Sequence, residues 1–242
     1  MTRVLITGAG RGIGAACALA YASSGARVAL ADLRAPDATA ERARTVGAAE
    51  VLPLICDVAD SGAVAEMATQ VEAAFGGLDI LIHCAGIIHE APLLQTPVAD
   101  FDRVIAVNLR GSFLVGQAAI GLMQKAGAGR VILIASDMAY CGRETFSPYV
   151  ASKHGVLGLV RSWAKEFAPS ILVNAICPGP IDTDMLGAEH MSPEWRAKEL
   201  AIPLARFGQA DEVAQLALFL GGPGGAYITG QGLGINGGSV MP

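Results

Sequence analysis

The chain has 242 residues, of which 52% are hydrophobic and 16% are charged, and its formal net charge is −5 at pH 7. This composition excludes an intrinsically disordered chain. The acidic net charge, with 17 Lys and Arg residues scattered along the chain, argues against the broad basic surface that nucleic-acid binding requires.

Short apolar runs alternate with helical segments along the chain. The runs that read as strands are 4–7, 27–31, 51–56, 79–83, 130–135 and 171–177. Runs that are apolar at every position, such as Ile80-Leu81-Ile82, are typical of a parallel sheet with helices on both faces. The pattern predicts a doubly wound α/β fold. Because no linker rich in Pro, Ser or charge interrupts it, we expect a single domain over residues 1–242.

Both ends of the chain and its cysteines indicate a cytoplasmic protein. The N-terminal residues enter a strand at once, without a long apolar h-region or a cleavage site. Residues 213–242 carry no charged side chain, but the Gly/Pro run 221–225 interrupts them, which favours a buried or intersubunit C-terminus over a membrane helix. We expect reduced thiols and no metal site from the five cysteines, which lack metal-ligand spacing: Cys17, Cys56, Cys84, Cys141 and Cys177.

A glycine-rich turn follows the first predicted strand. Its sequence is Thr7-Gly8-Ala9-Gly10-Arg11-Gly12-Ile13-Gly14, and an Ala-rich helical run, 15–24, comes next. Glycines allow a tight turn and a close approach of the backbone to a ligand, and the N-terminus of the following helix attracts an anion. The turn therefore predicts the pyrophosphate site of a dinucleotide, contacted by Gly8, Arg11, Gly12, Ile13 and Gly14.

An acidic residue, Asp32, ends the second predicted strand about twenty residues after the glycines. A carboxylate there can accept hydrogen bonds from the adenosine ribose hydroxyls and would repel a 2′-phosphate. Asp32 therefore favours NAD as the cofactor, and the adjacent Leu33 is also expected to contact it. Arg11 or Arg34 could instead meet the phosphate of NADP, so NADP stays open as an alternative.

Two more strand ends carry small or polar residues. They are Asp57-Val58 after the third strand and Cys84-Ala85-Gly86 after the fourth. Because doubly wound sheets bind ligands at the carboxyl ends of their strands, we expect these residues at the cofactor.

Ser136, Tyr149 and Lys153 form the candidate chemical site. A helix is predicted to begin at Ser147, whose side chain would cap it, with Pro148 in the first turn. Tyr149 and Lys153 then lie four residues apart on one face of this helix. A phenol with a pKa of about 10 is a poor base at neutral pH, but a nearby ammonium and an oxidised nicotinamide favour its phenolate. Ser136, just past the fifth strand, could hold the substrate oxygen while Tyr149 exchanges its proton, and no metal is needed.

The order of these motifs resembles that of the short-chain dehydrogenase/reductase family. The likeness covers nearly the whole chain and is carried by Thr7-Gly8 to Gly14, Asp57-Val58, Asn108, Ser136, Tyr149, Lys153 and Pro178-Gly179. The resemblance implies a Rossmann fold with a seven-stranded parallel sheet, and a homotetramer or homodimer. The C-terminal segments 203–208, 228–231 and 236–238 also resemble the family's ending, which implies a last strand packed at a subunit interface.

The resemblance also assigns roles to single residues. It implies that Asn108 completes the catalytic set by holding a water that links Lys153 to solvent. It implies cofactor contacts, with Thr183 at the carboxamide end of the cofactor, for Pro178, Gly179, Ile181 and Thr183.

One strand end departs from the family pattern. The family usually has Asn-Asn-Ala-Gly or Asn-Ala-Ala-Gly where this chain has His83-Cys84-Ala85-Gly86. The hydrogen bonding between strands that the usual asparagine provides is therefore not predicted here, and His83 is not counted among the catalytic residues.

Residues 181–203 break the rhythm of strands and helices and are richer in Met, His, Glu and Trp. They predict a small helical flap before the C-terminal strand. We expect the substrate pocket to be lined by this flap and by residues near the motifs: Ile88, His89, Met138, Tyr140, Arg143, Glu144, Pro180, Met185, Leu186 and Trp195. Among these residues, we expect direct substrate contacts from His89, Met138, Arg143, Met185 and Trp195. Arg143 could pair with an anionic substrate.

Three functions stay open. The first is an oxidoreductase that transfers a hydride between NAD and a secondary alcohol or ketone, which Asp32 favours. The second is an NADP-dependent carbonyl reductase that resembles the 3-oxoacyl-acyl carrier protein reductases. The third is a non-catalytic dinucleotide sensor, which would have no need for all of Asn108, Ser136, Tyr149 and Lys153. The sequence does not identify the alcohol or carbonyl substrate.

Overall fold

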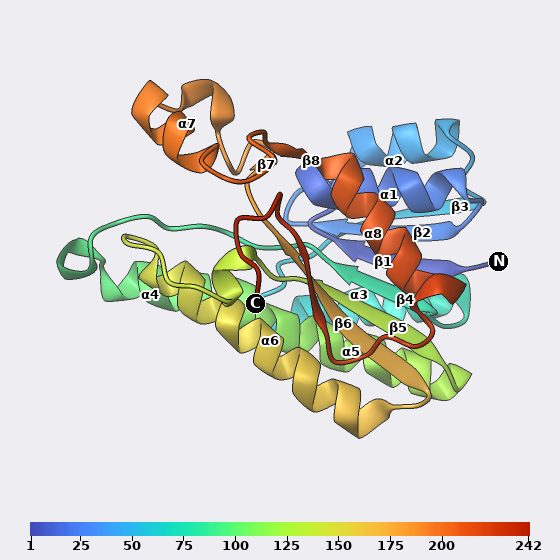
Figure 1. The fold of residues 1–242 in the computed structure, drawn as a ribbon. Helices are drawn as coiled ribbons and strands as arrows, with labels where there is room; N and C mark the ends of the chain where they lie inside the picture. Colours follow the sequence, from blue (N-terminus) through green and yellow to red (C-terminus); the bar gives the residue numbers. More distant parts are fainter.

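A seven-stranded parallel sheet forms the centre of the computed structural model, which describes residues 1–242 (Figure 1). The strands lie in the order β3-β2-β1-β4-β5-β6-β9. Their bounds are β1 Arg3–Thr7, β2 Arg27–Asp32, β3 Glu50–Ile55, β4 Ile80–His83, β5 Gly129–Ile134, β6 Ile171–Pro178 and β9 Gly232–Ile235. The predicted doubly wound Rossmann fold is confirmed, and each of the six predicted strands lies within one or two residues of its expected bounds.

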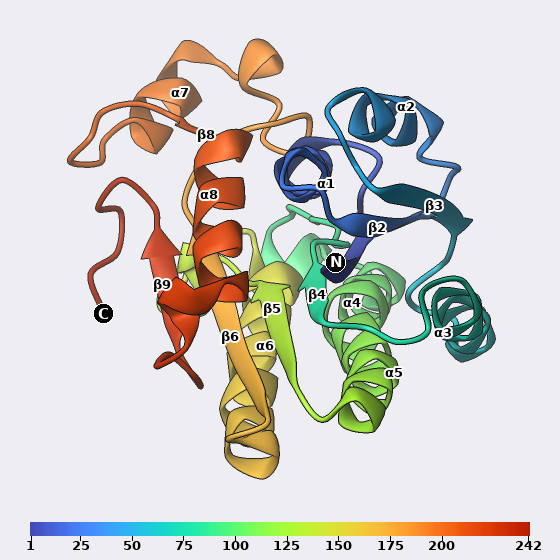
Figure 2. The same ribbon diagram turned by 90° about the vertical axis from the view of Figure 1, so that its right-hand side faces the viewer.

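Helices cover both faces of the sheet, as Figure 2 shows. α1 and α8 pack on one face, with α2 at its edge, and α3, α4, α5 and α6 pack on the other. The bounds are α1 Gly12–Ser23, α2 Asp37–Thr45, α3 Ser61–Phe75, α4 Val98–Ile105, α5 Gly111–Ala126, α6 Ser147–Phe167, α7 Pro193–Glu199 and α8 Ala210–Gly221.

The continuous apolar strands arise because each face of the sheet has its own core. Leu81 and Leu133 point into the core beneath α3, α5 and α6, whereas Ile82 and Ile132 point into the core beneath α1 and α8. Side chains alternate between the two faces along a strand, so a strand covered on both faces is apolar at every position.

The helical stretch Val98–Ala126 is long and apolar enough to cross a membrane by length and composition alone. It consists of α4, a π-helical turn over Ala106–Arg110, and α5. The α5 side chains Val115, Ala119 and Met123 are buried in the core against the sheet. The stretch is therefore a core helix of the α/β fold.

The predicted flap is a projection between β6 and α8 (Figure 1). A small parallel sheet closes its base, because β7 (Ile181–Asp182) pairs with β8 (Gly208–Gln209). The projection carries α7 and lies on the side of the sheet where the strands have their carboxyl ends.

The start of α6 differs in one detail from the prediction. The helix begins at Ser147 and has Pro148 in its first turn, as expected, but Phe146 is the N-cap residue and the Ser147 side chain makes no capping hydrogen bond. The expected capping role of Ser147 is wrong. Proline at the first turn, which needs no N–H partner there, is the signal that marks this helix start.

Candidate active site

A cleft of about 740 Å³ lies at the carboxyl ends of the strands. Its wall includes the glycine turn after β1, the ends of β2 to β6, the start of α6 and the projection with α7. Most of the predicted site residues line it: Gly8, Arg11, Gly12, Ile13, Gly14, Asp32, Leu33, Asp57, Val58, Cys84, Ala85, Gly86, Ser136, Met138, Arg143, Tyr149, Lys153, Pro178, Gly179, Ile181, Thr183, Met185 and Trp195.

The glycine turn is packed so closely that side chains would not fit. A Cβ on Gly14 would lie 2.0 Å from the carbonyl oxygen of Gly8, and a Cβ on Gly8, whose φ is +66°, would lie 2.8 Å from the backbone nitrogen of Ala85. The turn therefore brings the start of α1 against the end of β1. Its bare backbone and the N-terminus of α1 fit a pyrophosphate group.

The carboxylate of Asp32 is fixed by this turn. Its Oδ2 accepts a hydrogen bond from the backbone nitrogen of Gly10 at 2.8 Å, and its Oδ1 accepts one from that of Leu33 at 2.7 Å. Each carboxylate oxygen has a second lone pair, so both can still accept a hydroxyl hydrogen from a ligand in the cleft. This geometry fits a ribose diol.

The two arginines that could serve a 2′-phosphate are placed differently. Arg11 lines the cleft, but its guanidinium pairs with Asp184 at 3.2 Å, in a bridge with both side chains exposed. Arg34 is exposed and is not among the residues that line the cleft. Thr183, predicted to contact the carboxamide end of the cofactor, lies next to the glycine turn, because a Cβ on Gly12 would lie 3.4 Å from the Thr183 Cγ2.

Ser136, Tyr149 and Lys153 come together at the other end of the cleft. Ser136 follows β5, and the two α6 residues face it from one side of the helix. The Ser136 hydroxyl is close enough to Tyr149 to favour its phenolate. Lys153 Nζ lies 5.6 Å from the centre of the Tyr149 ring and donates a hydrogen bond of 2.7 Å to the carbonyl oxygen of Ile134.

Burial dominates the electrostatics of this group. Burial raises the pKa of Tyr149 to about 12, an effect that the charge of Asp137 adds to and the Ser136 hydroxyl opposes. Burial also lowers the pKa of Lys153 to about 8. Desolvation of the phenolate is thus the largest effect on Tyr149, and the expectation that Lys153 and an oxidised nicotinamide together favour the phenolate stays a prediction.

Asn108 lies behind the cleft and does not line it. It is buried in the π-helical turn, where its carboxamide exchanges two hydrogen bonds with the backbone of Ile87 and donates a third to Ser152 Oγ at 3.0 Å. Its side chain thus fixes Ile87, which lines the cleft, and ties it to Ser152 on α6. Its backbone carbonyl accepts a hydrogen bond of 2.6 Å from the Ser112 hydroxyl.

His83 joins two strands where the family has asparagine. Its Nδ1 lies 2.7 Å from Thr7 Oγ1, the residue that pairs with it across β1 and β4. Burial lowers the pKa of His83 to about 3, so the imidazole is neutral at neutral pH. The substitution thus keeps a side-chain bond between these strands.

The substrate end of the cleft differs most from expectation. Ile88, Pro180 and Leu186 line it with the residues named above, but His89, Tyr140 and Glu144 do not. His89 Nδ1 lies 3.9 Å from an oxygen of Asp100, and the Tyr140 hydroxyl donates to the carbonyl of Gly232. His89 is therefore corrected as a substrate contact, because its side chain packs toward α4.

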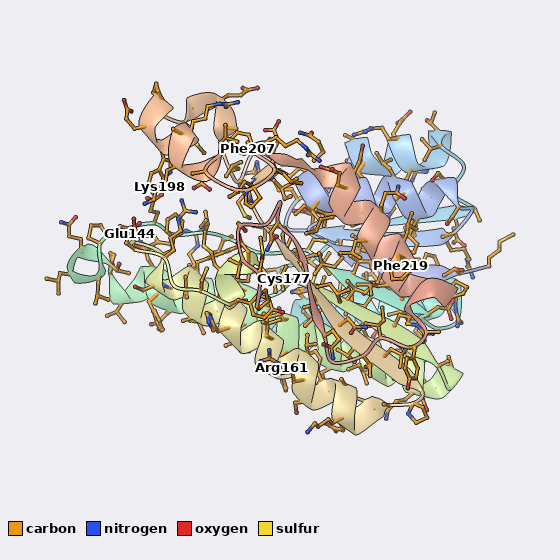
Figure 3. The ribbon with its side chains drawn as sticks, in the orientation of Figure 1. Glu144, Arg161, Cys177, Lys198, Phe207 and Phe219 are labelled. Carbon is orange, nitrogen blue, oxygen red and sulfur yellow. The ribbon has the colours of Figure 1, made fainter.

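Arg143 is already paired within the chain. Its guanidinium bonds to the carboxylate of Glu199 on α7, and it lies over the rings of Phe146 at 5.0 Å and Trp195 at 5.1 Å. Glu144 next to it pairs with Lys198, and Figure 3 shows these two side chains pointing toward each other. Glu199 thus neutralises the charge of Arg143 in this structure, and the pairing of Arg143 with an anionic substrate stays a prediction.

Sequence reasoning missed several residues that line the cleft, notably Ile87, Asp137, Phe146 and Glu199. Asp137 carried a signal, because it directly follows Ser136 at a strand end. Glu199 carried none, since its partner Arg143 lies 56 positions away in the sequence.

Comparisons with known proteins match nearly the whole chain. A family model described as enoyl-(acyl carrier protein) reductase matches residues 8–239. The 3-oxoacyl-acyl-carrier-protein reductase of Thermotoga maritima is 39% identical over 241 residues, which span 98% of this chain and 97% of that protein. The D-threitol dehydrogenase of Mycolicibacterium smegmatis is 39% identical over 239 residues, which span 98% and 92%.

Solved structures agree with these sequence matches. A protein of Agrobacterium tumefaciens proposed to be a 2-deoxy-D-gluconate 3-dehydrogenase, with bound NADP, has a TM-score of 0.90 and 35% identity to this chain. The match covers 98% of this chain and 95% of that one.

Proposed function

The chain belongs to the short-chain dehydrogenase/reductase family, and we propose that it is an NAD-dependent oxidoreductase that interconverts a secondary alcohol and a ketone. One observation carries this proposal: a single cleft is lined at one end by the glycine turn with Asp32, and at the other by Ser136, Tyr149 and Lys153. A dinucleotide held by the first group can reach the second.

Tyr149, Ser136 and Lys153 each have a separate role in the proposed reaction. A bound nicotinamide ring would supply the site that gives or takes hydride, and its oxidised form would add a positive charge. Tyr149 holds the proton that the substrate oxygen loses or gains, and the Ser136 hydroxyl hydrogen-bonds that oxygen. Lys153, whose ammonium is buried under the Tyr149 ring, offsets negative charge on the phenolate.

Asn108 has a supporting role in this proposal. Its carboxamide fixes Ile87 in the wall of the cleft, and, as the family resemblance implies, Asn108 would hold a water that links Lys153 to solvent. A π-helical turn at this position widens the helix locally, as such turns do at many functional sites.

NAD is favoured over NADP by Asp32. Its carboxylate faces the cleft next to the glycine turn, where a 2′-phosphate would be repelled. The alternative is an NADP-dependent reductase like the 3-oxoacyl-acyl-carrier-protein reductases. In its favour are Arg11 at the cleft, the Thermotoga relative, and the NADP in the Agrobacterium structure. A dinucleotide sensor is the second alternative, and the complete Ser136, Tyr149 and Lys153 set argues against it.

We also propose that residues 1–242 act as one domain, in the cytoplasm, and as a homotetramer or homodimer. Support for an oligomer comes from apolar side chains that a single chain leaves exposed along the helical stretch Val98–Ala126, namely Val98, Phe101 and Phe113. Sedimentation of the purified protein would test it, and a monomer at micromolar concentration would contradict it.

The function is tested by turnover with a matched pair of tyrosine variants. The purified protein is given NAD and a panel of secondary alcohols and polyols, and NADH formation is followed by its absorbance. Tyr149→Phe is expected to lower kcat by at least about a hundredfold, because a proton carrier is lost. Tyr227→Phe removes a hydroxyl from a fully exposed side chain and should leave kcat unchanged. Full activity in Tyr149→Phe would exclude the proposed role.

A further inference from the structure

Asp137 places a carboxylate directly against the candidate catalytic serine. Its Oδ1 accepts a hydrogen bond from Ser136 Oγ at 3.1 Å and one from the backbone nitrogen of Met138 at 2.8 Å. Its Oδ2 accepts a third, from Ser239 Oγ at 2.6 Å. Asp137 also lines the cleft, so its charge faces the space in which the substrate would lie.

These contacts determine what the Ser136 hydroxyl can do. A carboxylate has no hydrogen to give, so the hydrogen in the bond to Asp137 belongs to Ser136. The Ser136 oxygen also accepts a bond from the backbone nitrogen of Met138 at 3.2 Å. While that bond is made, one lone pair of Ser136 remains for Tyr149 and the substrate. Ser136 must therefore release Asp137 before it can donate to the phenolate, the contact by which it opposes the rise of the Tyr149 pKa.

The C-terminal segment holds this carboxylate in place. Ser239 lies in a tight turn in which its backbone nitrogen donates to the carbonyl of Asn236, and the Asn236 side chain bonds to Val240 and Gly238. The same segment reaches the base of the projection, because Leu204 donates to the carbonyl of Gly237. Ser239 is therefore presented to Asp137 by an ordered turn.

We propose that Asp137 is a positioning residue, which acts on the reaction through Ser136 and Tyr149 and is held by Ser239. The proposal rests on the proposed function for its effect on turnover. The carboxylate takes the hydrogen of Ser136 and adds a negative charge beside Tyr149, so both effects disfavour negative charge on the phenol and on the substrate oxygen. Asp137 therefore moves the working range of alcohol oxidation to higher pH.

Few other charged or titratable groups lie around Asp137 and Tyr149. Lys153 faces Tyr149 from the same helix. Asp137 acts electrostatically on Arg143 and Cys141 of its own loop and on Cys177 of β6. Arg143 is neutralised by Glu199, so its guanidinium does not cancel the charge of Asp137. Burial and the charge of Asp137 raise the pKa of Cys141, so this thiol adds no second negative charge in the neutral range.

Asp137→Asn tests the proposal because it removes the charge and keeps the shape. The midpoint of the rise of kcat/KM with pH, for oxidation of an alcohol, should fall by about one unit, the shift typical of removing a nearby charge. At a pH below the midpoint the variant should therefore oxidise the alcohol faster than the parent, by up to about tenfold. Glu90→Gln is the matched control, since Glu90 lines the cleft but bonds to Thr145, and its midpoint should not move.

A titration that needs no substrate separates this proposal from the proposed function. Tyrosinate absorbance is recorded against pH for the parent and for Asp137→Asn. From each curve, the curve of the same protein carrying Tyr149→Phe in addition is subtracted, and the difference is the signal of Tyr149. The pKa of Tyr149 should fall by about one unit in Asp137→Asn. An unmoved Tyr149 signal, or a lower kcat at an unchanged midpoint, would overturn the proposal. Absence of turnover in the parent would contradict the function and leave the titration to decide on Asp137.

Discussion

The two ends of the cleft are built by different means. At the cofactor end, contiguous residues 8–14 form a turn that the backbone itself fixes, and Asp32 is bonded to that turn. At the substrate end, side chains from distant segments meet: Arg143 and Phe146 after β5, and Trp195 and Glu199 on α7. The cofactor end therefore depends on tight backbone packing, whereas the substrate end depends on ion pairs that hold α7 over the cleft.

The largest effect is expected from a methyl group in the cofactor turn. A Cβ on Gly14 would lie 2.0 Å from the carbonyl oxygen of Gly8, so Gly14→Ala must move the start of α1. We expect a loss of NADH affinity of at least about tenfold and a destabilisation of about 1–3 kcal/mol, measured by NADH fluorescence and thermal unfolding.

Gly121 is the control for this variant, because a Cβ there meets nothing within 4 Å. Gly121→Ala in α5 should keep NADH affinity and gain stability of up to about 1 kcal/mol from helix propensity. Equal NADH affinity in Gly14→Ala and Gly121→Ala would show that the turn does not hold the cofactor.

The next effect concerns the choice of cofactor. Asp32→Ala removes the carboxylate that would bind a ribose diol and repel a 2′-phosphate, so the ratio of kcat/KM for NAD to that for NADP should fall by about tenfold or more. Asp37→Ala, which removes a carboxylate outside the cleft, should leave that ratio unchanged. The same ratio in both variants would mean that Asp32 does not contact the ribose.

A smaller and different effect is expected at the substrate end. Glu199→Gln leaves the Arg143 guanidinium largely buried without its anion, so α7 should pack less firmly and KM for the substrate should rise several-fold. NADH affinity should stay near that of the parent. Glu144→Gln breaks the neighbouring pair with Lys198, whose side chains are exposed, and should have less effect. A loss confined to NADH affinity would show that the two ends are not separate.

The pH dependence of alcohol oxidation involves both ends of the cleft, because turnover needs both the cofactor and the substrate. Burial holds the pKa of Tyr149 above its ordinary value, so the phenol is protonated at neutral pH and oxidation must begin with loss of that proton. Log kcat/KM for alcohol oxidation should therefore rise with pH through the mildly alkaline range, by up to about one unit per pH unit. A flat profile, with a hydride isotope effect to show that chemistry limits the rate, would contradict this role.

The difference between the two ends also explains what the sequence could predict. The glycine turn, Asp32 and the Tyr149 and Lys153 pair are local patterns, in which spacing along one element determines the position in space. The pairing of Arg143 with Glu199, and of Asp137 with Ser239, joins residues 56 and 102 positions apart, so no local pattern reveals either. The pKa of Tyr149 was not predictable for a related reason, since it depends on how deeply the folded chain buries the phenol.

The cofactor claim is tested most directly by titrating the purified protein in parallel with NADH and NADPH and following the fluorescence of each. NADH should bind saturably and more tightly than NADPH, by about tenfold or more, since Asp32 repels the 2′-phosphate. Tighter binding of NADPH would contradict it and favour the NADP-dependent reductase, and binding of neither would contradict a dinucleotide site in this cleft.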